Sequence, residues 1–316
     1  MSAPRKVVVI GAGPAGYVCA IRLAQLGQDV TVIEKEEIGG TCLNVGCIPS
    51  KALIAAGALM TKIGESSKMG ITTSKPKLDL DTLIEWKQGI VGRLTGGVSG
   101  LLKNHKCKVM CDQILSTVGR RPYSEGLNLE AAGLKVEKQG FLKVDDQMRT
   151  SVPNIYAVGD IAGQPMLAHK GSKEGLVAAA VIAGKPERYD VRCVPAVIFT
   201  APEMASVGET EEQLKERGVK FTSGKFPFAA SGRAMSLMET DGFVKILADA
   251  ETDELLGVHM VGPEVTELIA EAGLAIEMGA TAEDIGRTIH AHPTLPEAMM
   301  EAAEAVHKLA VHIYQK

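Results

Sequence analysis

Residues 39–51 read Gly-Gly-Thr-Cys-Leu-Asn-Val-Gly-Cys-Ile-Pro-Ser-Lys, and the interpretation of the whole chain depends on them. Four residues separate Cys42 from Cys47, a spacing that can close a small disulfide ring at the start of a helix. A helix N-terminus favours a thiolate because the backbone dipole stabilises negative charge there, and Lys51 adds a cation one turn further on. The stretch predicts a redox-active cysteine pair. The same spacing without supporting context would fit two unrelated free thiols.

A nucleotide-binding pattern lies immediately upstream of the cysteines. The sequence predicts a short buried strand over Lys6–Ile10, a helix over Tyr17–Leu26 and a second strand over Asp29–Glu34. The loop Gly11-Ala-Gly-Pro-Ala-Gly16 joins the first strand to the helix. Strand, glycine loop, helix and strand in this order are typical of a dinucleotide site, with the phosphates at the helix N-terminus.

Four residues of this pattern have separate roles at such a site. Gly11 permits the tight turn, Gly13 lets the backbone approach a pyrophosphate, and Gly16 lets helix and strand pack closely. Glu34 ends the second strand, where a carboxylate can hold ribose hydroxyls. The pattern fits FAD and NAD equally. The cysteine pair that follows favours FAD, because a dithiol passes electrons naturally to a flavin.

The composition limits the class of protein. The chain has 316 residues, enough for two domains with cores of their own. Its net charge of -4 and its 4% of aromatic residues argue against nucleic acid as a partner. No apolar run approaches ~18 residues and no signal peptide is visible, so we expect a cytoplasmic protein without a membrane span. Six cysteines, sparse apart from one pair, suit a reducing compartment with one catalytic disulfide and no metal site.

The second chemically informative stretch lies near the C-terminus, where residues 290–297 read His-Ala-His-Pro-Thr-Leu-Pro-Glu. A dithiol must lose a proton before it attacks a disulfide, and histidine titrates in the range needed to accept that proton. A structural role is also open, since Thr294 and Glu297 fit a capping box with Pro296 at the first helical position. Both roles can hold at once, and His290 is expected to be structural.

Together, residues 39–51 and 290–297 resemble the active-site signatures of the flavin disulfide oxidoreductases. The doubled histidine motif resembles that of the dihydrolipoamide dehydrogenases more than that of the glutathione or mercury reductases. The resemblance implies bound FAD, a homodimer, and dihydrolipoamide or a similar small dithiol as the substrate. It also implies an α/β fold, with a FAD-binding Rossmann-type parallel-sheet domain followed by an α+β dimerisation domain.

The resemblance assigns residues to the site. It implies that His292, from the opposite subunit, is the base and that Glu297 orients its imidazole. The substrate thiolate is expected to attack Cys42, as the more exposed sulfur, while Cys47 faces the flavin and Lys51 tunes it. Asp160 is expected to accept a hydrogen bond from the ribityl chain. The full set of implied FAD contacts is Gly11, Gly13, Gly16, Glu34, Gly40, Thr41, Lys51, Gly119, Asp160, Ala168 and His169.

Two domains are expected, residues 1–188 for FAD and residues 189–316 for dimerisation. In the first, the sequence predicts helices over 50–64, 81–104, 127–132 and 168–184, strands over 106–110 and 154–158, and a hairpin around 138–140. In the second, it predicts strands over 194–199, 204–208, 220–227, 242–248 and 255–261, and helices over 210–217, 264–278, 282–289 and 296–308. Runs of like elements, rather than strict alternation, indicate an antiparallel sheet in an α+β domain.

The sequence contains no second glycine fingerprint. Met110 is followed directly by residues 111–122, which resemble the strand that closes the nicotinamide domain in the family and re-enters the flavin domain. We therefore expect the NAD-binding domain to be absent, with a junction near residues 110–112. NAD reactivity would be lost, and oxygen, a quinone or an artificial acceptor would take the electrons.

Three other interpretations are open at this point. One is a glutathione or mercuric reductase-like relative, against which the doubled histidine motif argues. Another is a minimal FAD-binding dimeric scaffold with little turnover, suggested by the abrupt join after Met110. The third is a scaffold that no longer retains FAD.

Overall fold

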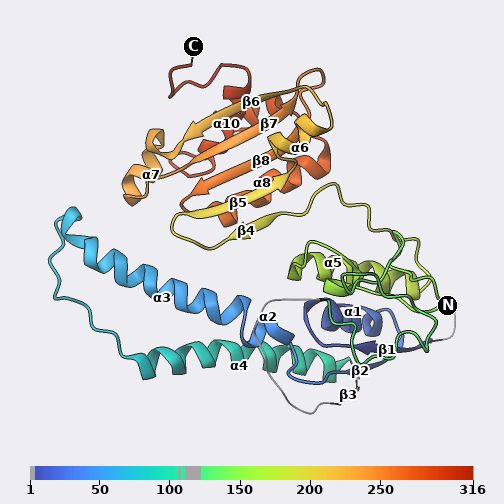
Figure 1. The fold of residues 1–316 in the computed structure, drawn as a ribbon. Helices are drawn as coiled ribbons and strands as arrows, with labels where there is room; N and C mark the ends of the chain where they lie inside the picture. The colour runs from blue at the N-terminus through green and yellow to red at the C-terminus, as the bar shows by residue number, and fades with distance from the viewer. Residues whose placement is uncertain (1–3, 106–107, 111–121, 316) are drawn as a thin grey trace. The chain divides into compact units, whose positions relative to one another are not determined.

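The computed structural model describes residues 4–105, 108–110 and 122–315. The chain divides into two compact units, Met1–Asp190 and Val191–Lys316, and each is described by itself (Figure 1). The division falls close to the boundary at 188/189 expected from the sequence. The first unit contains a parallel sheet and the second an antiparallel sheet, which confirms the predicted fold class. Residues 111 and 112 of the expected junction lie outside the described residues.

The sheet of the first unit has three strands among the described residues. They are β1 (Lys6–Ile10), β2 (Asp29–Ile33) and β3 (Lys108–Met110), all parallel, with β2 in the middle. Helix α1 (Pro14–Gln25) connects β1 to β2. The Gly11 N–H donates to the Ile33 carbonyl at 2.7 Å, so the loop after β1 lies beside the carboxyl end of β2. Ligands bind at this edge of a doubly wound sheet.

Helix α5 (Ala168–Ile182) packs closely on α1 because a glycine faces the contact. A Cβ at Gly175 would lie 2.6 Å from the Ala15 carbonyl oxygen and 3.2 Å from the Cys19 Cβ, so no larger residue fits there. The two helices and the sheet share one hydrophobic core. Its most buried members include Leu23, Val32, Leu102, Val177 and Ala179.

The opposite face of the parallel sheet is exposed. Side chains alternate along a strand, and those of Val7 and Val9 pack on the core. Val8, Ile10 and Ile33 point the other way and are 58%, 64% and 42% exposed. We call these three residues the bare sheet face. The prediction that Lys6–Ile10 is a buried strand is therefore wrong for one of its two faces, because the described part of the chain leaves that face largely uncovered.

Residues 40–104 form a helical hairpin in which α3 and α4 run side by side in opposite directions (Figure 1). Its elements are α2 (Gly40–Asn44), α3 (Cys47–Glu65), the 3-10 helix η1 (Ser66–Met69) and α4 (Leu80–Asn104). The Asp79 carboxylate caps α4 by accepting the Thr82 N–H at 3.1 Å. The surface of the hairpin includes several large exposed apolar side chains, those of Leu53, Ile54, Leu59, Ile84, Trp86 and Leu94.

One stretch of the described residues, Gly40–Met69, is long and apolar enough to cross a membrane by length and composition. The expectation concerned an unbroken apolar run, and polar residues such as Ser50, Lys51 and Lys62 interrupt this stretch. The stretch is not one helix, however, because a turn at Val45 and Gly46 separates α2 from α3. It also contains the cysteine motif and the charged residues Lys51 and Lys62. We therefore interpret it as the surface of the helical hairpin.

Between residues 122 and 167 the chain consists mainly of turns. The predicted hairpin around 138–140 is present, with a bridge between Val136 and Leu142. The predicted helix over 127–132 is wrong, because Asn128 adopts a left-handed φ of 51° and the backbone closes turns instead. The predicted strand over 154–158 is also wrong, since only Tyr156 forms a bridge. The 3-10 helix η2 (Gly159–Ala162) follows it.

The second unit is built on a five-stranded antiparallel sheet in the order β4-β5-β8-β7-β6. Its strands are β4 (Ala196–Ile198), β5 (Glu203–Gly208), β6 (Phe221–Pro227), β7 (Phe243–Asp249) and β8 (Leu255–Gly262). Its helices are α6 (Glu211–Glu216), the 3-10 helix η3 (Phe228–Ala230), α7 (Gly232–Leu237), α8 (Val265–Met278), α9 (Ala282–Arg287) and α10 (Glu297–Val306). All five predicted strands are present, and α7 was not predicted.

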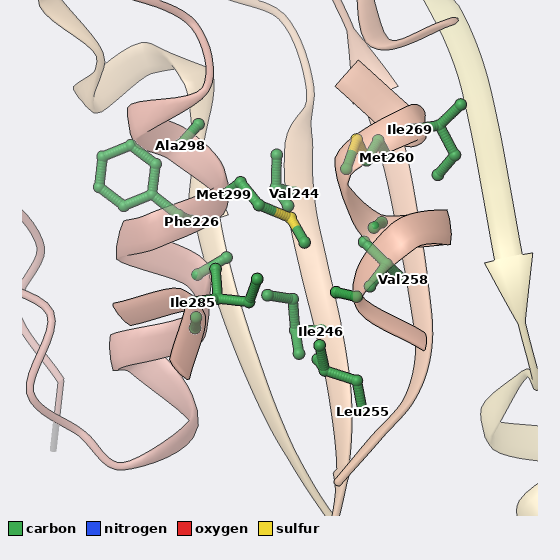
Figure 2. Close-up of a cluster of buried hydrophobic side chains, with 14 of the residues drawn as sticks. Phe226, Val244, Ile246, Leu255, Val258, Met260, Ile269, Ile285, Ala298 and Met299 are labelled. Atoms are coloured by element: carbon green, nitrogen blue, oxygen red, sulfur yellow. The ribbon is translucent and has the colours of Figure 1, made fainter. Parts of the chain in front are cut away.

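One face of this sheet packs on α8, α9 and α10 to form the core of the second unit. Figure 2 shows Phe226, Val244 and Ile246 of the sheet meeting Met299 of α10 and Ile285 of α9. Strand β6 approaches α10 so closely that a Cβ at its Gly224 would lie 2.1 Å from an α10 carbonyl oxygen. The antiparallel sheet thus holds α10 in a fixed position.

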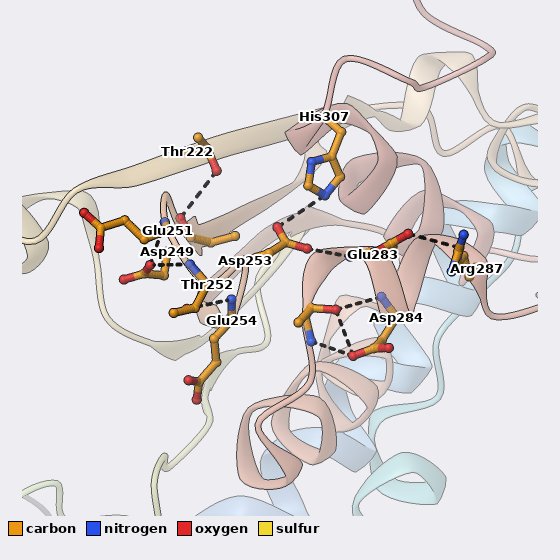
Figure 3. Close-up of polar contacts among 12 residues, drawn as sticks. Thr222, Asp249, Glu251, Thr252, Asp253, Glu254, Glu283, Asp284, Arg287 and His307 are labelled. Atoms are coloured by element: carbon orange, nitrogen blue, oxygen red, sulfur yellow. Dashed lines mark hydrogen bonds and ion pairs between the residues drawn. The ribbon is translucent and has the colours of Figure 1, made fainter.

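Polar contacts hold the middle and the C-terminal end of α10. Asp253, in the turn between β7 and β8, accepts the Glu283 N–H at 2.9 Å and pairs with His307 at 3.2 Å (Figure 3). After α10 the chain turns back on the helix, where the buried Glu301 accepts the backbone N–H of Val311 at 3.0 Å and also pairs with the His312 ring.

Candidate active site

The glycine loop lies at the carboxyl ends of β1 and β2, where the sequence predicts it. Gly11 has a φ of 96°, which only glycine adopts readily, and a Cβ at Gly16 would lie 1.9 Å from the Gly11 carbonyl oxygen. The Glu34 carboxylate accepts the N–H groups of Ala12 and Glu36. It is therefore held beside the loop, as expected for a residue that binds ribose hydroxyls.

Two helix N-termini converge on this loop. Helix α1 begins after Gly13, and α2 begins after Gly39. The Gly39 N–H donates to the Ala12 carbonyl at 2.8 Å, and a Cβ at Gly40 would lie 2.9 Å from the Gly13 Cα. Both helices therefore start with closely packed glycines. Partial positive charge at a helix N-terminus suits a phosphate group.

The residues present fit a dinucleotide such as FAD. A Cβ at Gly13 would meet no protein atom within 4 Å, and Gly13 has an ordinary φ of -67°, so neither packing nor backbone conformation requires glycine there. The open space beside Gly13 is what a phosphate would need to approach the backbone. Thr41, in α2, is exposed next to the same loop.

A third segment, the turn that carries Asp160, lies against the glycine loop. Cβ atoms built at Gly159 and Gly171 would each lie 3.1 Å from the Ala15 Cβ, so this turn, α1 and α5 meet at Ala15. Residues Ala168 and His169 begin α5 close to the turn in sequence. The structure therefore brings together the glycine loop, Glu34, Gly40 and the turn of Asp160. Gly119 lies outside the described residues.

The cysteine pair lies between α2 and α3. Cys42 is in α2 and Cys47 is the first residue of α3. Both are free thiols in the structure, which corresponds to the reduced form of the predicted disulfide. The side chain and backbone N–H of Cys47 both act on the Cys42 thiol, so the two cysteines are close neighbours in space.

The pKa of Cys42 is raised to about 12 by its surroundings. Burial is the largest cause, and its hydrogen bond with the Cys47 side chain acts in the same direction. The Cys47 N–H and the positive charge of Lys51 oppose the shift. Lys51 thus acts on the cysteine pair, as its place one turn into α3 suggests. Burial and the neighbouring Cys42 raise the pKa of Tyr17 as well.

The expected order of exposure of the two sulfurs is wrong. The sequence-based assignment has Cys42 as the more exposed residue, whereas Cys42 is half-buried and Cys47 is exposed. The reason is local. Cys42 lies within α2, beside the buried Leu43 and close to Tyr17, while Cys47 follows the Gly46 turn and starts a new helix.

The C-terminal histidine lies in the second unit, before α10. The His292 Nδ1–H donates to a Glu297 carboxylate oxygen at 2.8 Å, and the residue's side chain is 80% exposed. The other Glu297 oxygen accepts the Thr294 N–H at 2.7 Å. Glu297 therefore orients the imidazole and leaves Nε2 facing outward, where it can accept a proton.

Half of the predicted capping box is present. Glu297 accepts the Thr294 N–H, but the Thr294 hydroxyl donates to the Ala291 carbonyl at 2.6 Å. Helix α10 begins at Glu297, and Pro296 is its N-cap rather than its first residue. The pKa of Glu297 is lowered: burial opposes ionisation, but hydrogen bonds from Thr294 and His292 outweigh it. The carboxylate can thus cap the helix and orient the His292 ring at once.

His290 is buried and engaged at both ring nitrogens. Its Nδ1 contacts the Thr288 carbonyl at 2.8 Å and its Nε2 contacts Glu271 of α8 at 2.9 Å. The expected structural role agrees with this geometry. Sequence analysis missed Glu271, because nothing in the local pattern of α8 links it to a residue so far along the chain.

Family profiles match both units. A profile described as pyridine nucleotide-disulphide oxidoreductase matches residues 5–110 and 91–175, and one described as the dimerisation domain of the same proteins matches residues 194–303. The chain belongs to the pyridine nucleotide-disulphide oxidoreductase family.

Individual relatives of this oxidoreductase are named dihydrolipoyl dehydrogenase. The protein of Thermus scotoductus is 37% identical over 458 residues, covering 98% of this chain and 99% of the relative. That of Bacillus subtilis is 36% identical over 456 residues, covering 97% of each. The alignments are much longer than the 316 residues of this oxidoreductase, so they must open long gaps in its sequence.

A solved structure confirms the fold. The crystal structure of LpdA from Mycobacterium tuberculosis superposes with a TM-score of 0.85, covers 96% of this oxidoreductase and 99% of that chain, and is 19% identical in sequence. Among the described residues of this oxidoreductase, no group of three or more His, Cys, Asp or Glu side chains is placed to hold a metal ion.

Proposed function

We propose that the chain is a FAD-dependent oxidoreductase that oxidises dihydrolipoamide or a similar small dithiol through a Cys42–Cys47 disulfide. The observation that carries the proposal is the position of the cysteine pair. Cys42 lies in the same short helix whose first residue, Gly40, packs against Gly13 of the glycine loop. A redox pair and a dinucleotide cradle are therefore built from one continuous segment.

The proton and sulfur chemistry follows from residues of this chain. His292 accepts a proton at Nε2 from one substrate thiol, and Glu297 holds the Nδ1–H as positive charge develops on the ring. The substrate thiolate forms a bond to one cysteine and breaks the Cys42–Cys47 bond. The second substrate thiol then displaces that cysteine and gives its proton to the released sulfur, which leaves an oxidised substrate disulfide, one cysteine thiol and one cysteine thiolate. Bound FAD supplies the acceptor for the electron pair.

The cradle residues would hold FAD by separable contacts. The glycine loop and the N-termini of α1 and α2 would bind the pyrophosphate, Glu34 the ribose, and the Asp160 turn the ribityl chain. Gly40, Thr41, Lys51, Ala168 and His169 would complete the contacts. Which cysteine the substrate attacks is not assigned by exposure, since Cys47 is the more exposed of the two.

We also propose a homodimer, with residues 1–188 for FAD and 189–316 for dimerisation. A profile described as a dimerisation domain matches residues 194–303, and the exposed apolar side chains of the helical hairpin are of the kind that a partner covers. In this arrangement His292 serves the cysteine pair of the opposite subunit. The sparse cysteines favour a cytoplasmic enzyme, because they suit a reducing compartment.

Loss of NAD reactivity completes the proposal. The sequence has one glycine fingerprint, and the alignments with full-length relatives must span a long gap. The same profile matches the first unit in two overlapping segments, which fits a deletion near residues 110–112. Oxygen, a quinone or an artificial dye would then receive the electrons.

The test is anaerobic addition of dihydrolipoamide to the purified protein while its visible spectrum is recorded. We expect bound flavin that bleaches with wild type and with Cys193→Ser, and does not bleach with Cys42→Ser. Flavin that stays oxidised in the wild type would refute dithiol oxidation. Reduction of the flavin by a low concentration of NADH in the same cuvette would refute the loss of NAD reactivity.

One observation is compatible with the scaffold alternative. Val8, Ile10 and Ile33 of the bare sheet face are exposed among the described residues, as in a flavin domain that has lost part of its covering, and such a loss fits a protein that binds flavin with little turnover. Bound flavin that no dithiol reduces, together with a cooperative unfolding transition, would establish that alternative.

A further inference from the structure

Helix α5 carries a buried ion pair that the proposed chemistry does not use. Lys170 and Glu174 are 6% and 3% exposed, and the Lys170 Nζ lies 2.8 Å from a Glu174 carboxylate oxygen. Burying two charges is costly, and an apolar pair of similar size is often as stable or more stable. A contribution to stability alone is therefore a weak explanation for this pair.

Both side chains also form hydrogen bonds with the backbone of a single turn, residues 159–163. The Lys170 ammonium donates to the Gly163 carbonyl at 2.9 Å and to the Gly159 carbonyl at 3.4 Å, so its three N–H groups all have acceptors. The second Glu174 oxygen accepts the Gly159 N–H at 2.8 Å. The pair thus binds both ends of the segment 159–163.

That segment is the turn that carries Asp160. It contains only a short 3-10 helix, and side chains of α5 provide the partners for three of its backbone polar groups. On its other side it packs on Ala15 of the glycine loop. The pair therefore determines where Asp160 lies relative to that loop.

We infer that Lys170 and Glu174 are positioning residues that hold the Asp160 turn in the conformation that binds FAD. The inference rests on the proposed function, because it requires FAD at Asp160. A turn fixed in advance does not have to be ordered when the cofactor arrives, so the pair raises affinity without touching FAD.

The first experiment measures FAD binding to the apoprotein by quenching of flavin fluorescence. Lys170→Met should raise the dissociation constant of FAD about tenfold or more, by analogy with metal sites, where loss of a residue that orients a ligand costs about 10–100-fold in affinity. Lys173→Met is the matched control. It makes the same change on the exposed side of the same helix, where Lys173 pairs only distantly with Glu187. Its dissociation constant for FAD should stay within about twofold of the wild-type value.

A double-mutant cycle separates positioning from general stability. If Lys170 acts through Asp160, Lys170→Met should change the affinity of an Asp160→Ala protein by no more than about threefold. An equal loss of affinity in both backgrounds would show a structural role only and overturn the inference. Absence of FAD binding by the wild type would instead refute the proposed function.

A measurement on the wild type covers the case in which Lys170→Met does not fold. Hydrogen exchange of the apoprotein should show the Gly159 amide strongly protected before FAD is added, because Glu174 already accepts it. Protection that develops only after FAD binds would mean that the cofactor, rather than the ion pair, orders the turn, and would overturn the inference.

Discussion

In the reduced protein freed of flavin, we expect iodoacetamide to modify Cys47 much faster than Cys42. The thiolate is the form that attacks the reagent. Since burial and the bond to Cys47 raise the pKa of Cys42 to about 12, only about one Cys42 in 10⁴ is ionised at pH 8. Cys47 is also the more exposed residue, at the start of α3. Both effects favour the same sulfur.

The assay follows alkylation at each cysteine by peptide mass spectrometry at pH 8, 9 and 10. The rate at Cys42 should rise about tenfold with each pH unit below its pKa. Cys193 is an internal comparison, because burial and Glu277 raise its pKa to about 11. Its ionised fraction should be about tenfold larger than that of Cys42 at each pH.

The Cys47→Ala variant is the decisive control. It removes the hydrogen-bond partner but leaves the burial of Cys42, which is the largest cause of the shift, so Cys42 should remain slow at pH 8. Preferential alkylation of Cys42 in the wild type, or a Cys42 rate that does not change with pH, would refute the reasoning.

Three further predictions concern the second unit. His292→Gln should lower dithiol-dependent turnover about 10²–10⁴-fold, and because His292 is exposed the melting temperature should not change; a large drop in melting temperature would contradict this. Gly224→Ala should cost about 1–3 kcal/mol in urea denaturation, because the new Cβ would strike the α10 backbone, whereas Gly232→Ala meets open space and should cost less. The hydrogen bond and charge of Glu301 raise the pKa of His312 in the folded protein. The pair therefore adds its full contribution to the free energy of unfolding below the unfolded pKa of about 6.5, and this contribution is lost as pH rises through the folded pKa. The melting temperatures of wild type and His312→Ala should therefore differ more at pH 6 than at pH 9, and a constant difference would exclude this linkage.

Local patterns in the sequence predicted most of the architecture. The strand, glycine loop and helix of residues 6–25 depend on short-range periodicity and on glycine geometry, and the structure has them where predicted. The antiparallel strands of the second unit were found for the same reason. The contact between His292 and Glu297 was predictable because both belong to one short motif.

Features that depend on contacts between distant segments were not predicted. The order of exposure of Cys42 and Cys47 depends on how α2 packs, and the helix α2 itself was not predicted. The sequence spacing of Lys170 and Glu174 suggests an ordinary surface pair on a helix, and only the packing of α5 shows that it is buried. The exposure of the bare sheet face was not predicted either, because it depends on which other segments cover the strand, and the strand's own residues do not determine that.

The bare sheet face also affects the handling of the protein. The exposed side chains of Val8, Ile10 and Ile33 should bind a fluorescent dye such as ANS in the fully native protein, so dye binding alone is not evidence of unfolding here. Sulfate strengthens apolar association, and we therefore expect light scattering to increase with ammonium sulfate well before the unit loses its helical circular dichroism. The Ile10→Thr variant should keep the strand, because threonine is also β-branched. Its light scattering should begin to increase at a higher ammonium sulfate concentration than that of the wild type.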